Sequence, residues 1–220
     1  MSIQKQFEQI GGHFINPAHE ISVKLKDIHA FIFDWDGVFN NGQKSNPDGS
    51  PFSEADSMGI NMFRFSYWLK HNKLPFVAIV TGENNLTAKN FAKREHLNAV
   101  LLKTKNKGEA IKKLADINGF SLDQTAFIFD DILDLSAAEI CKLSFCIKRS
   151  ASPLFEEFVL TNGLCAYISA NQGGENAVRE ITELLIGLNG NFDETVKKRM
   201  EYKNDYENYI SLRNSIEPEF

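Results

Sequence analysis

The sequence predicts an α/β fold, a Rossmann-like three-layer domain built around a parallel sheet. Short apolar runs recur along the chain, and polar residues follow each of them. Strands that are buried on both faces of a parallel sheet have this pattern. Segments of helix length separate the runs, and this alternation is typical of βαβ crossovers.

The predicted elements follow in chain order. The strands are runs of four or five mostly apolar residues, at 30–33, 76–80, 99–102, 126–129, 144–147 and 165–168. Helices are predicted between and after them, at 58–71, 84–96, 108–118, 133–141 and 175–188. The segment 39–57 interrupts the alternation. Because it contains Asn-Gly at 41–42 and Pro-Asp-Gly at 47–49, we expect a small β-hairpin insert there.

The two ends of the chain differ from the centre, and we divide it into three parts. Residues 1–28 are predicted to form an N-terminal arm with one short helix, and 29–190 form the α/β domain. In 191–220 apolar residues recur at intervals of four among many charges, which predicts an amphipathic helical tail. Such a helix must pack on the core or on a neighbouring subunit.

Composition excludes several classes of protein. The 220 residues carry a net charge of −5, which argues against a nucleic-acid partner because phosphate binding usually needs a basic face. No apolar run exceeds five residues, so we expect neither a membrane span nor a signal peptide. The three cysteines have no metal-binding spacing and read as reduced thiols. A cytoplasmic location is expected.

Polar side chains follow four of the predicted strands. Asp34 and Asp36 follow the first, Thr81 and Gly82 the second, and Lys107 a turn after the third. Asp130, Asp131 and Asp134 follow the fourth. The carboxyl ends of parallel strands form the ligand crevice of open α/β sheets, so these side chains should converge there.

These residue types together suit phosphoryl transfer. Clustered carboxylates repel one another unless a cation lies among them, and oxygen ligands in an open site suit Mg²⁺. A threonine hydroxyl and a lysine ammonium bind phosphate oxygens. Each residue alone has a simpler explanation: Asp36 in a turn, Thr81 as a helix cap, Lys107 as one of several solvated lysines, and Asp131 and Asp134 as acids at a helix start.

In this order the motifs resemble those of the haloacid dehalogenase (HAD) superfamily. The stretch 33–38 (Phe-Asp-Trp-Asp-Gly-Val) is similar to its first motif, Thr81 to the second, Lys107 to the third, and Asp-Asp-x-x-Asp at 130–134 to the fourth. Response-regulator receivers also use Asp, Thr and Lys, but they place them differently and fit poorly.

The resemblance implies a role for each residue. Asp34 would be the nucleophile and form an aspartyl-phosphate, and Asp36 would be the general acid and base. Asp34, the main-chain carbonyl of Asp36, and Asp130 would hold Mg²⁺. Residues that bind the phosphoryl group would be Thr81, Gly82 and Lys107, and residues that orient metal waters or Lys107 would be Asp131 and Asp134.

The spacing of the motifs leaves no room for a cap domain. Thr81 lies 47 positions after Asp34, and Asp130 lies 23 positions after Lys107. Over 30–188 the chain looks like the capless phosphatases of 3-deoxy-2-ulosonate phosphates. The likeness includes Asp-Gly at 48–49, Asp-Ser-Met-Gly-Ile at 56–60 and Gly-Gly-Glu-Asn-Ala-Val-Arg-Glu at 173–180. It implies a small sugar-acid phosphate as substrate and a homotetramer in which a neighbouring chain helps to close each site.

Three departures from that pattern bear on function. Phe129 stands where the family usually has Gly, Asn106 where Asp is common, and Glu83 where the octulosonate type has Arg. Glu83, with Arg94 a few helical turns further along, resembles the type specific for nine-carbon acids such as KDN 9-phosphate. The simpler explanation of both is that they are surface residues. The alternative is a non-catalytic phosphatase-like subunit that binds a ligand or a partner enzyme, which Phe129 and the long tail would fit.

Overall fold

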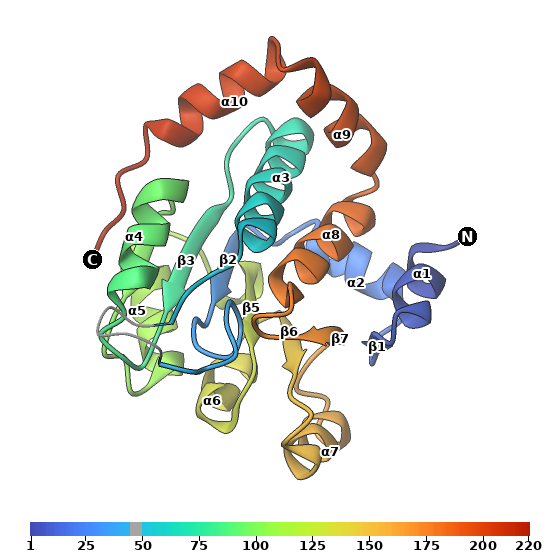
Figure 1. Ribbon diagram of the computed structural model, residues 1–220, viewed down its shortest axis with the longest axis vertical. Coiled ribbons are helices and arrows are strands. Elements are labelled where there is room, and N and C mark those ends of the chain that lie inside the picture. The colour runs from blue at the N-terminus through green and yellow to red at the C-terminus, as the bar shows by residue number, and fades with distance from the viewer. Residues whose placement is uncertain (45–49) are drawn as a thin grey trace.

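The structure is a computed structural model that describes residues 1–44 and 50–220, and these residues form a three-layer α/β domain (Figure 1). The sheet has the strand order β1-β7-β6-β5-β2-β3-β4. All strand pairs are parallel except β1 with β7, which is antiparallel. The strands of the described residues are β1 (His13–Phe14), β2 (Ala30–Phe33), β3 (Phe76–Val80), β4 (Ala99–Leu101), β5 (Thr125–Phe129), β6 (Leu143–Lys148) and β7 (Tyr167–Gln172). The predicted fold class is confirmed.

Helices cover both faces of this sheet. One face packs against α2 (Ala18–Leu25), α3 (Glu54–His71), α4 (Leu86–Glu95) and α8 (Ala177–Asn189). The other packs against α5 (Lys107–Asn118), α6 (Leu135–Ala138) and α7 (Pro153–Thr161). The chain also forms α1 (Ile3–Gln9), α9 (Phe192–Glu201) and α10 (Asp205–Asn214). Side chains alternate between the two faces along each strand, so every strand contributes to both cores. Phe31 and Phe33 of β2 point to the first face and Ile32 to the second.

Helix α3 begins four residues before its predicted start. Ser53 is the N-cap, and its hydroxyl accepts a hydrogen bond from the Ala55 N–H at 3.0 Å. Acidic residues in the first turn, Glu54 and Asp56, suit the positive end of the helix dipole. Asp56 also accepts a hydrogen bond at 2.8 Å from the Arg179 N–H, in the first turn of α8. The start of α3 therefore caps a second helix.

The predicted hairpin is not formed by the residues on either side of 45–49. Described residues 39–44 and 50–53 contain no strand, and Asn40 makes only an isolated bridge with Asp36. The Asp-Gly turn at 48–49 lies outside the described residues. A lone two-stranded hairpin is marginal in water, and here Phe39 and Phe52 instead pack against Phe91 at 5.1 and 4.8 Å between ring centroids.

Both ends of the chain extend the domain. The N-terminal segment, predicted as one helix and an arm, forms α1, the edge strand β1 and α2. Phe14 of β1 packs edge-on against Tyr167 of β7, with ring centroids 4.7 Å apart. Helix α7 was not predicted, although Pro153 at its first position and the buried Phe155 and Val159 are helix signals.

The tail packs on its own chain and forms two helices instead of one. Figure 1 shows α9 and α10 running past α3 so that the C-terminus lies beside α4. The Tyr209 hydroxyl donates to the Asn61 carbonyl of α3 at 2.9 Å. At the end of the tail, Glu219 bridges the edge strand β4, where its carbonyl accepts from the Val100 N–H at 2.8 Å. The tail therefore covers one edge of the sheet.

In the described part of the chain, no helix is both long and apolar enough to cross a lipid bilayer.

Asp56 provides a test of the contact between α3 and α8. The side chain is fully buried, and burial raises its pKa from 3.8 to about 6, although the hydrogen bond from Arg179 opposes the rise. Between these values the folded chain holds a proton that the unfolded chain has lost, so stability falls as pH rises from about 4 to about 6. Asp56→Asn keeps the acceptor and has no charge. As the pH rises from 4 to 6, the unsubstituted protein should therefore lose about 2 kcal/mol of unfolding free energy relative to the Asp56→Asn variant.

Urea unfolding of both proteins at several pH values between 4 and 7 measures this difference. Parallel stability curves would show that ionisation of Asp56 does not weaken the fold.

Candidate active site

The carboxyl ends of β2, β3 and β5 and the start of α5 meet at a cleft of about 500 Å³. Sheet order explains the convergence, because β2 lies between β3 and β5. All but one of the predicted site residues line it, namely Asp34, Asp36, Thr81, Gly82, Glu83, Lys107, Asp130, Asp131 and Asp134. The exception is Arg94.

Lys107 joins two of the predicted carboxylates. It is the first residue of α5, after the N-cap Asn106, and only 5% of it is exposed. Its ammonium lies 2.6 Å from Asp34 Oδ1 and also contacts Asp134 Oδ1. Burial alone would lower the pKa of Lys107, but the two carboxylates more than offset it and raise the pKa. The lysine is therefore a buried, charged cation at the floor of the cleft.

Three buried carboxylates cluster around this cation. Asp34, Asp130 and Asp134 each offer an oxygen, and these oxygens lie within 4.8 Å of one another. Burial and the charge of Asp134 raise the pKa of Asp34 well above its usual range, while Lys107 opposes the rise. Burial also raises the pKa of Asp130 to about 7, although Arg149 opposes it. The cluster has more negative charge than its surroundings neutralise.

A divalent cation fits this donor set. Lys107 and Arg149 are the cations that contact the three carboxylates within the described residues. Asp130 Oδ1 is buried and accepts no hydrogen bond from any described residue, which is costly unless a cation binds it. Carboxylate oxygens are the ligands that Mg²⁺ prefers.

The Asp36 side chain is turned away from that cluster. Its Oδ1 accepts a hydrogen bond from the Ser50 hydroxyl and its Oδ2 one from the Asn85 amide, both at 2.8 Å. Two hydrogen bonds fix the carboxylate at the wall of the cleft. Sequence reasoning missed both partners. Asn85 follows β3 and could have been found by the rule used for Thr81, whereas no pattern marks Ser50.

The carboxylates of the fourth motif accept hydrogen bonds from the backbone of the loop on which they lie. Asp134 Oδ2 accepts from the N–H groups of Asp130 and Asp131 at 3.4 and 3.3 Å, and its other oxygen contacts Lys107. Asp131 accepts from the Ile132 N–H at 2.7 Å. Asp134 thus ties Lys107 to the loop that carries Asp130.

Gly37 allows the first and fourth motifs to approach closely. Its φ is +86°, which side chains rarely adopt, and a Cβ there would lie 2.0 Å from Asp130 Oδ2. Asp130 could not reach its position beside Asp34 if residue 37 had a side chain.

The aromatic residues of these motifs lie in the core. Trp35 stacks on Phe39 with ring centroids 4.7 Å apart, as the alternation at the strand end predicts. Phe129 is fully buried on the other face of the sheet and stacks on Phe127 at 5.9 Å. Its ring does not fill the cleft, so this departure from the family pattern gives the non-catalytic alternative no support.

The two residues that the sequence singles out as candidates for substrate specificity, Glu83 and Arg94, have different surroundings. Glu83 lines the cleft and pairs with Lys44 at 3.3 Å. Arg94 is not among the lining residues. Its guanidinium makes two hydrogen bonds to Glu54, at 2.6 and 2.5 Å, and pairs with Glu95. Arg94 therefore joins α4 to the start of α3.

Arg149 is the main residue that sequence reasoning missed. It follows β6 at the same edge of the sheet, and its Nη2 lies 2.5 Å from Asp130 Oδ2. The rule that polar residues at strand ends line the crevice applies to it equally. It had no counterpart among the motifs and was therefore overlooked.

Comparison with known proteins agrees with the resemblance that the sequence motifs suggested. No family model matches the chain. It is 26% identical over 171 residues to the 3-deoxy-D-manno-octulosonate (KDO) 8-phosphate phosphatase of Haemophilus influenzae. The aligned region covers 76% of this chain and 87% of that enzyme.

Solved structures show the likeness in three dimensions. The KDO 8-phosphate phosphatase of Moraxella catarrhalis, in complex with magnesium, phosphate and KDO, has a TM-score of 0.69 and 28% identity and covers 82% of this chain and 98% of its own. The cobalt-bound Haemophilus influenzae phosphatase has a TM-score of 0.65 and 25% identity, over 80% of this chain and 99% of its own. A Legionella pneumophila hydrolase of HAD subfamily III A shares the fold, with a TM-score of 0.68, 23% identity, and coverage of 83% and 94%.

Over most of its length, the chain is therefore similar in sequence and fold to KDO 8-phosphate phosphatases. Between Asp34 and β3 the described residues form α3 and connecting loops, and no cap domain lies among them. Between Lys107 and Asp130 lie α5, one 3₁₀ turn and β5.

The Lys107 ion pairs give a prediction about stability. Lys107→Met leaves two buried carboxylates without their cation, which typically costs about 3 kcal/mol. We expect a loss of this size in the free energy of unfolding, measured by urea denaturation in buffer with a chelator. Lys105→Met changes an exposed lysine on the loop that leads into α5; it is the control and should change stability by less than about 0.5 kcal/mol. Equal losses in the two variants would mean that the ion pairs do not stabilise the fold.

Proposed function

We propose that this chain is a Mg²⁺-dependent phosphomonoesterase that hydrolyses a sugar-acid phosphate through an aspartyl-phosphate. The observation that carries the proposal is the pairing of buried Lys107 with Asp34, beside the fixed Asp36 carboxylate, in a cleft lined by Thr81. Asp34 is the nucleophile, Asp36 the general acid and base, and Lys107 and Thr81 the groups that bind the phosphoryl oxygens, all within one site. Similarity to phosphatases along most of the chain supports it.

The first step transfers the phosphoryl group to the protein. An Asp34 oxygen attacks phosphorus, and the bond from phosphorus to the leaving oxygen breaks. Asp36, protonated and rotated from its contacts with Ser50 and Asn85 toward the leaving oxygen, donates its proton there, so an alcohol leaves. Lys107 and the Thr81 hydroxyl stabilise the charge on the phosphoryl oxygens.

The second step releases phosphate. Asp36, now a carboxylate, takes a proton from water, the water oxygen attacks phosphorus, and the bond to Asp34 breaks. Asp34, the Asp36 carbonyl and Asp130 would hold Mg²⁺. When bound, the ion neutralises charge on the phosphoryl oxygens and on these carboxylates.

The proposed substrate class is the 3-deoxy-2-ulosonate phosphates, with KDO 8-phosphate and KDN 9-phosphate as candidates. The Moraxella catarrhalis structure, which binds KDO and phosphate, supports the class. Glu83 in the cleft favours the nine-carbon acids. Arg94, paired with Glu54 on α3, would need to exchange partners to contribute. Because the cleft has no cap, we propose that the chain forms a homotetramer in which a neighbour helps to close each site.

A phosphate-release assay tests the activity. The unsubstituted protein with Mg²⁺ should hydrolyse KDO 8-phosphate and KDN 9-phosphate, and Asp34→Asn should lower kcat by at least about 10³-fold because the nucleophile is lost. Asp27→Asn, on the loop before β2, is a matched control and should keep full activity. Release of phosphate by Asp34→Asn at the unsubstituted rate would exclude a covalent route through Asp34.

Removal of the metal tests the cation separately. Dialysis against a chelator should abolish phosphate release, and added Mg²⁺ should restore it, because the carboxylate cluster repels a phosphate dianion until a cation neutralises it. Activity that survives dialysis, with metal content checked by elemental analysis, would contradict this part of the proposal.

A further inference from the structure

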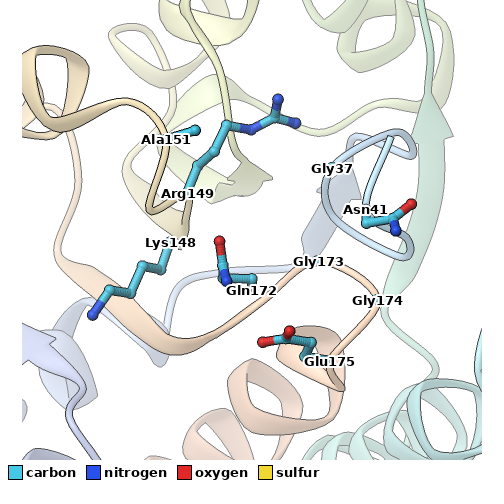
Figure 2. Close-up of a pocket in the computed structure, with 9 residues that line it drawn as sticks. All are labelled: Gly37, Asn41, Lys148, Arg149, Ala151, Gln172, Gly173, Gly174 and Glu175. Carbon is cyan, nitrogen blue, oxygen red and sulfur yellow. The ribbon is translucent and has the colours of Figure 1, made fainter. Parts of the chain in front are cut away.

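A second pocket adjoins the cleft. It has a volume of about 290 Å³ and lies where β6 and β7 end, next to the loop that follows β2 (Figure 2). Its lining is Gly37, Asn41, Lys148, Arg149, Ala151, Gln172, Gly173, Gly174 and Glu175. Asn41 and Arg149 also line the cleft, so the two cavities are neighbours. The proposed function does not yet use this pocket.

Close packing of backbone forms one wall of the pocket. A Cβ at Gly173 would lie 2.0 Å from the carbonyl oxygen of Gly37, so the loop after β7 packs directly on the loop that carries Asp36. Gly174 has a φ of +83°, which also requires glycine. The Gly-Gly pair therefore holds the pocket at a constant position beside the catalytic loop.

The charged side chains of the pocket are mostly free to bind a ligand. Figure 2 shows Lys148 and Arg149 extending in different directions from the end of β6. Arg149 uses Nη2 for Asp130, and its other nitrogens donate to no side chain in the described residues. Lys148 makes no ion pair within the same part of the chain. Gln172 accepts a hydrogen bond from the Ser150 N–H at 3.0 Å, which leaves its amide NH₂ available.

We propose that this pocket binds the carboxylate of the leaving group, with Arg149 as the principal contact. The inference rests on the proposed function, and it assigns to the substrate a carboxylate on the part that departs. Arg149 contacts Asp130 through Nη2, and the N–H groups of its Nη1 and Nε are left to donate charge-assisted hydrogen bonds to a carboxylate. Lys148 lines the same pocket and extends in another direction, so it adds to the positive potential there without sharing the Arg149 contact (Figure 2).

The remaining polar groups suit hydroxyls. Glu175 is an acid and would repel a carboxylate nearby, so the carboxylate lies at Arg149 and the Glu175 oxygens accept from hydroxyl groups. The Asn41 and Gln172 amides can donate to hydroxyl or carboxylate oxygens. A phosphate ester with its phosphoryl group at Asp34 reaches this pocket past Arg149 and Asn41, which line both cavities.

Kinetics with two esters test the inference. KDO 8-phosphate has the carboxylate and p-nitrophenyl phosphate does not. Arg149 also contacts Asp130, so Arg149→Gln is expected to slow both esters. The inference predicts that kcat/KM falls at least 10-fold more for KDO 8-phosphate than for p-nitrophenyl phosphate. Lys148→Gln should show the same selectivity with a smaller effect. Lys112→Gln, which removes a surface lysine paired with Glu109, is the control and should leave both esters unchanged. Equal losses on both esters, or no loss on either, overturn the proposal.

Binding without turnover separates this inference from the proposed function. By isothermal titration, free KDO should bind the unsubstituted protein at least 10-fold more tightly than its methyl ester, which lacks the carboxylate charge. Arg149→Gln should remove the difference. This result supports carboxylate binding by the pocket even if no ester releases phosphate. In that case the proposed phosphatase activity is wrong and the carboxylate site stands. Equal binding of KDO and its methyl ester overturns the pocket while phosphate release is unaffected.

Discussion

The pairing of Lys107 with Asp34 and Asp134 is the interaction on which the site depends. Removing an ammonium and two carboxylates from water is costly, and only good mutual geometry offsets the cost. That geometry requires β2 and β5 side by side, because they carry Asp34 and Asp130 to one edge of the sheet. It also requires α5 to begin at Lys107, which its N-cap Asn106 ensures. The surplus of negative charge around this cation is what makes the cleft suitable for a metal and, through it, for a phosphate.

Glycines determine how closely the catalytic loops approach. Asp130 can lie beside Asp34 because Gly37 has no Cβ, and the loop after β7 can lie on Gly37 because of Gly173. The cleft at Asp34 and the pocket at Lys148 and Arg149 therefore share a wall made of backbone. Backbone walls change little when side chains move, so the two cavities keep a constant relation to each other.

Helix α3 connects the site to the periphery of the chain. Its first turn caps α8 through Asp56, and its middle accepts the tail through Asn61. Arg94 ties α4 to the same first turn. The tail then continues to the edge strand β4, so the segment after residue 190 stabilises the outer side of the domain. It lies on this chain's own helices and sheet edge instead of over the cleft.

The sequence by itself determined the central strands and most of the site. Apolar runs such as 30–33 and 126–129 are buried on both faces, so their composition alone identifies them, and polar residues at their ends must meet at one edge. Tertiary structure decided what depends on partners distant in the chain: the edge strand β1, the pairing of Arg94 with Glu54, and the hydrogen bonds from Asn85 and Ser50 to Asp36. Such contacts leave no periodic pattern because each involves single residues. The orientation of Phe129 away from the cleft was settled in the same way, by packing around the sheet and not by its neighbours in sequence.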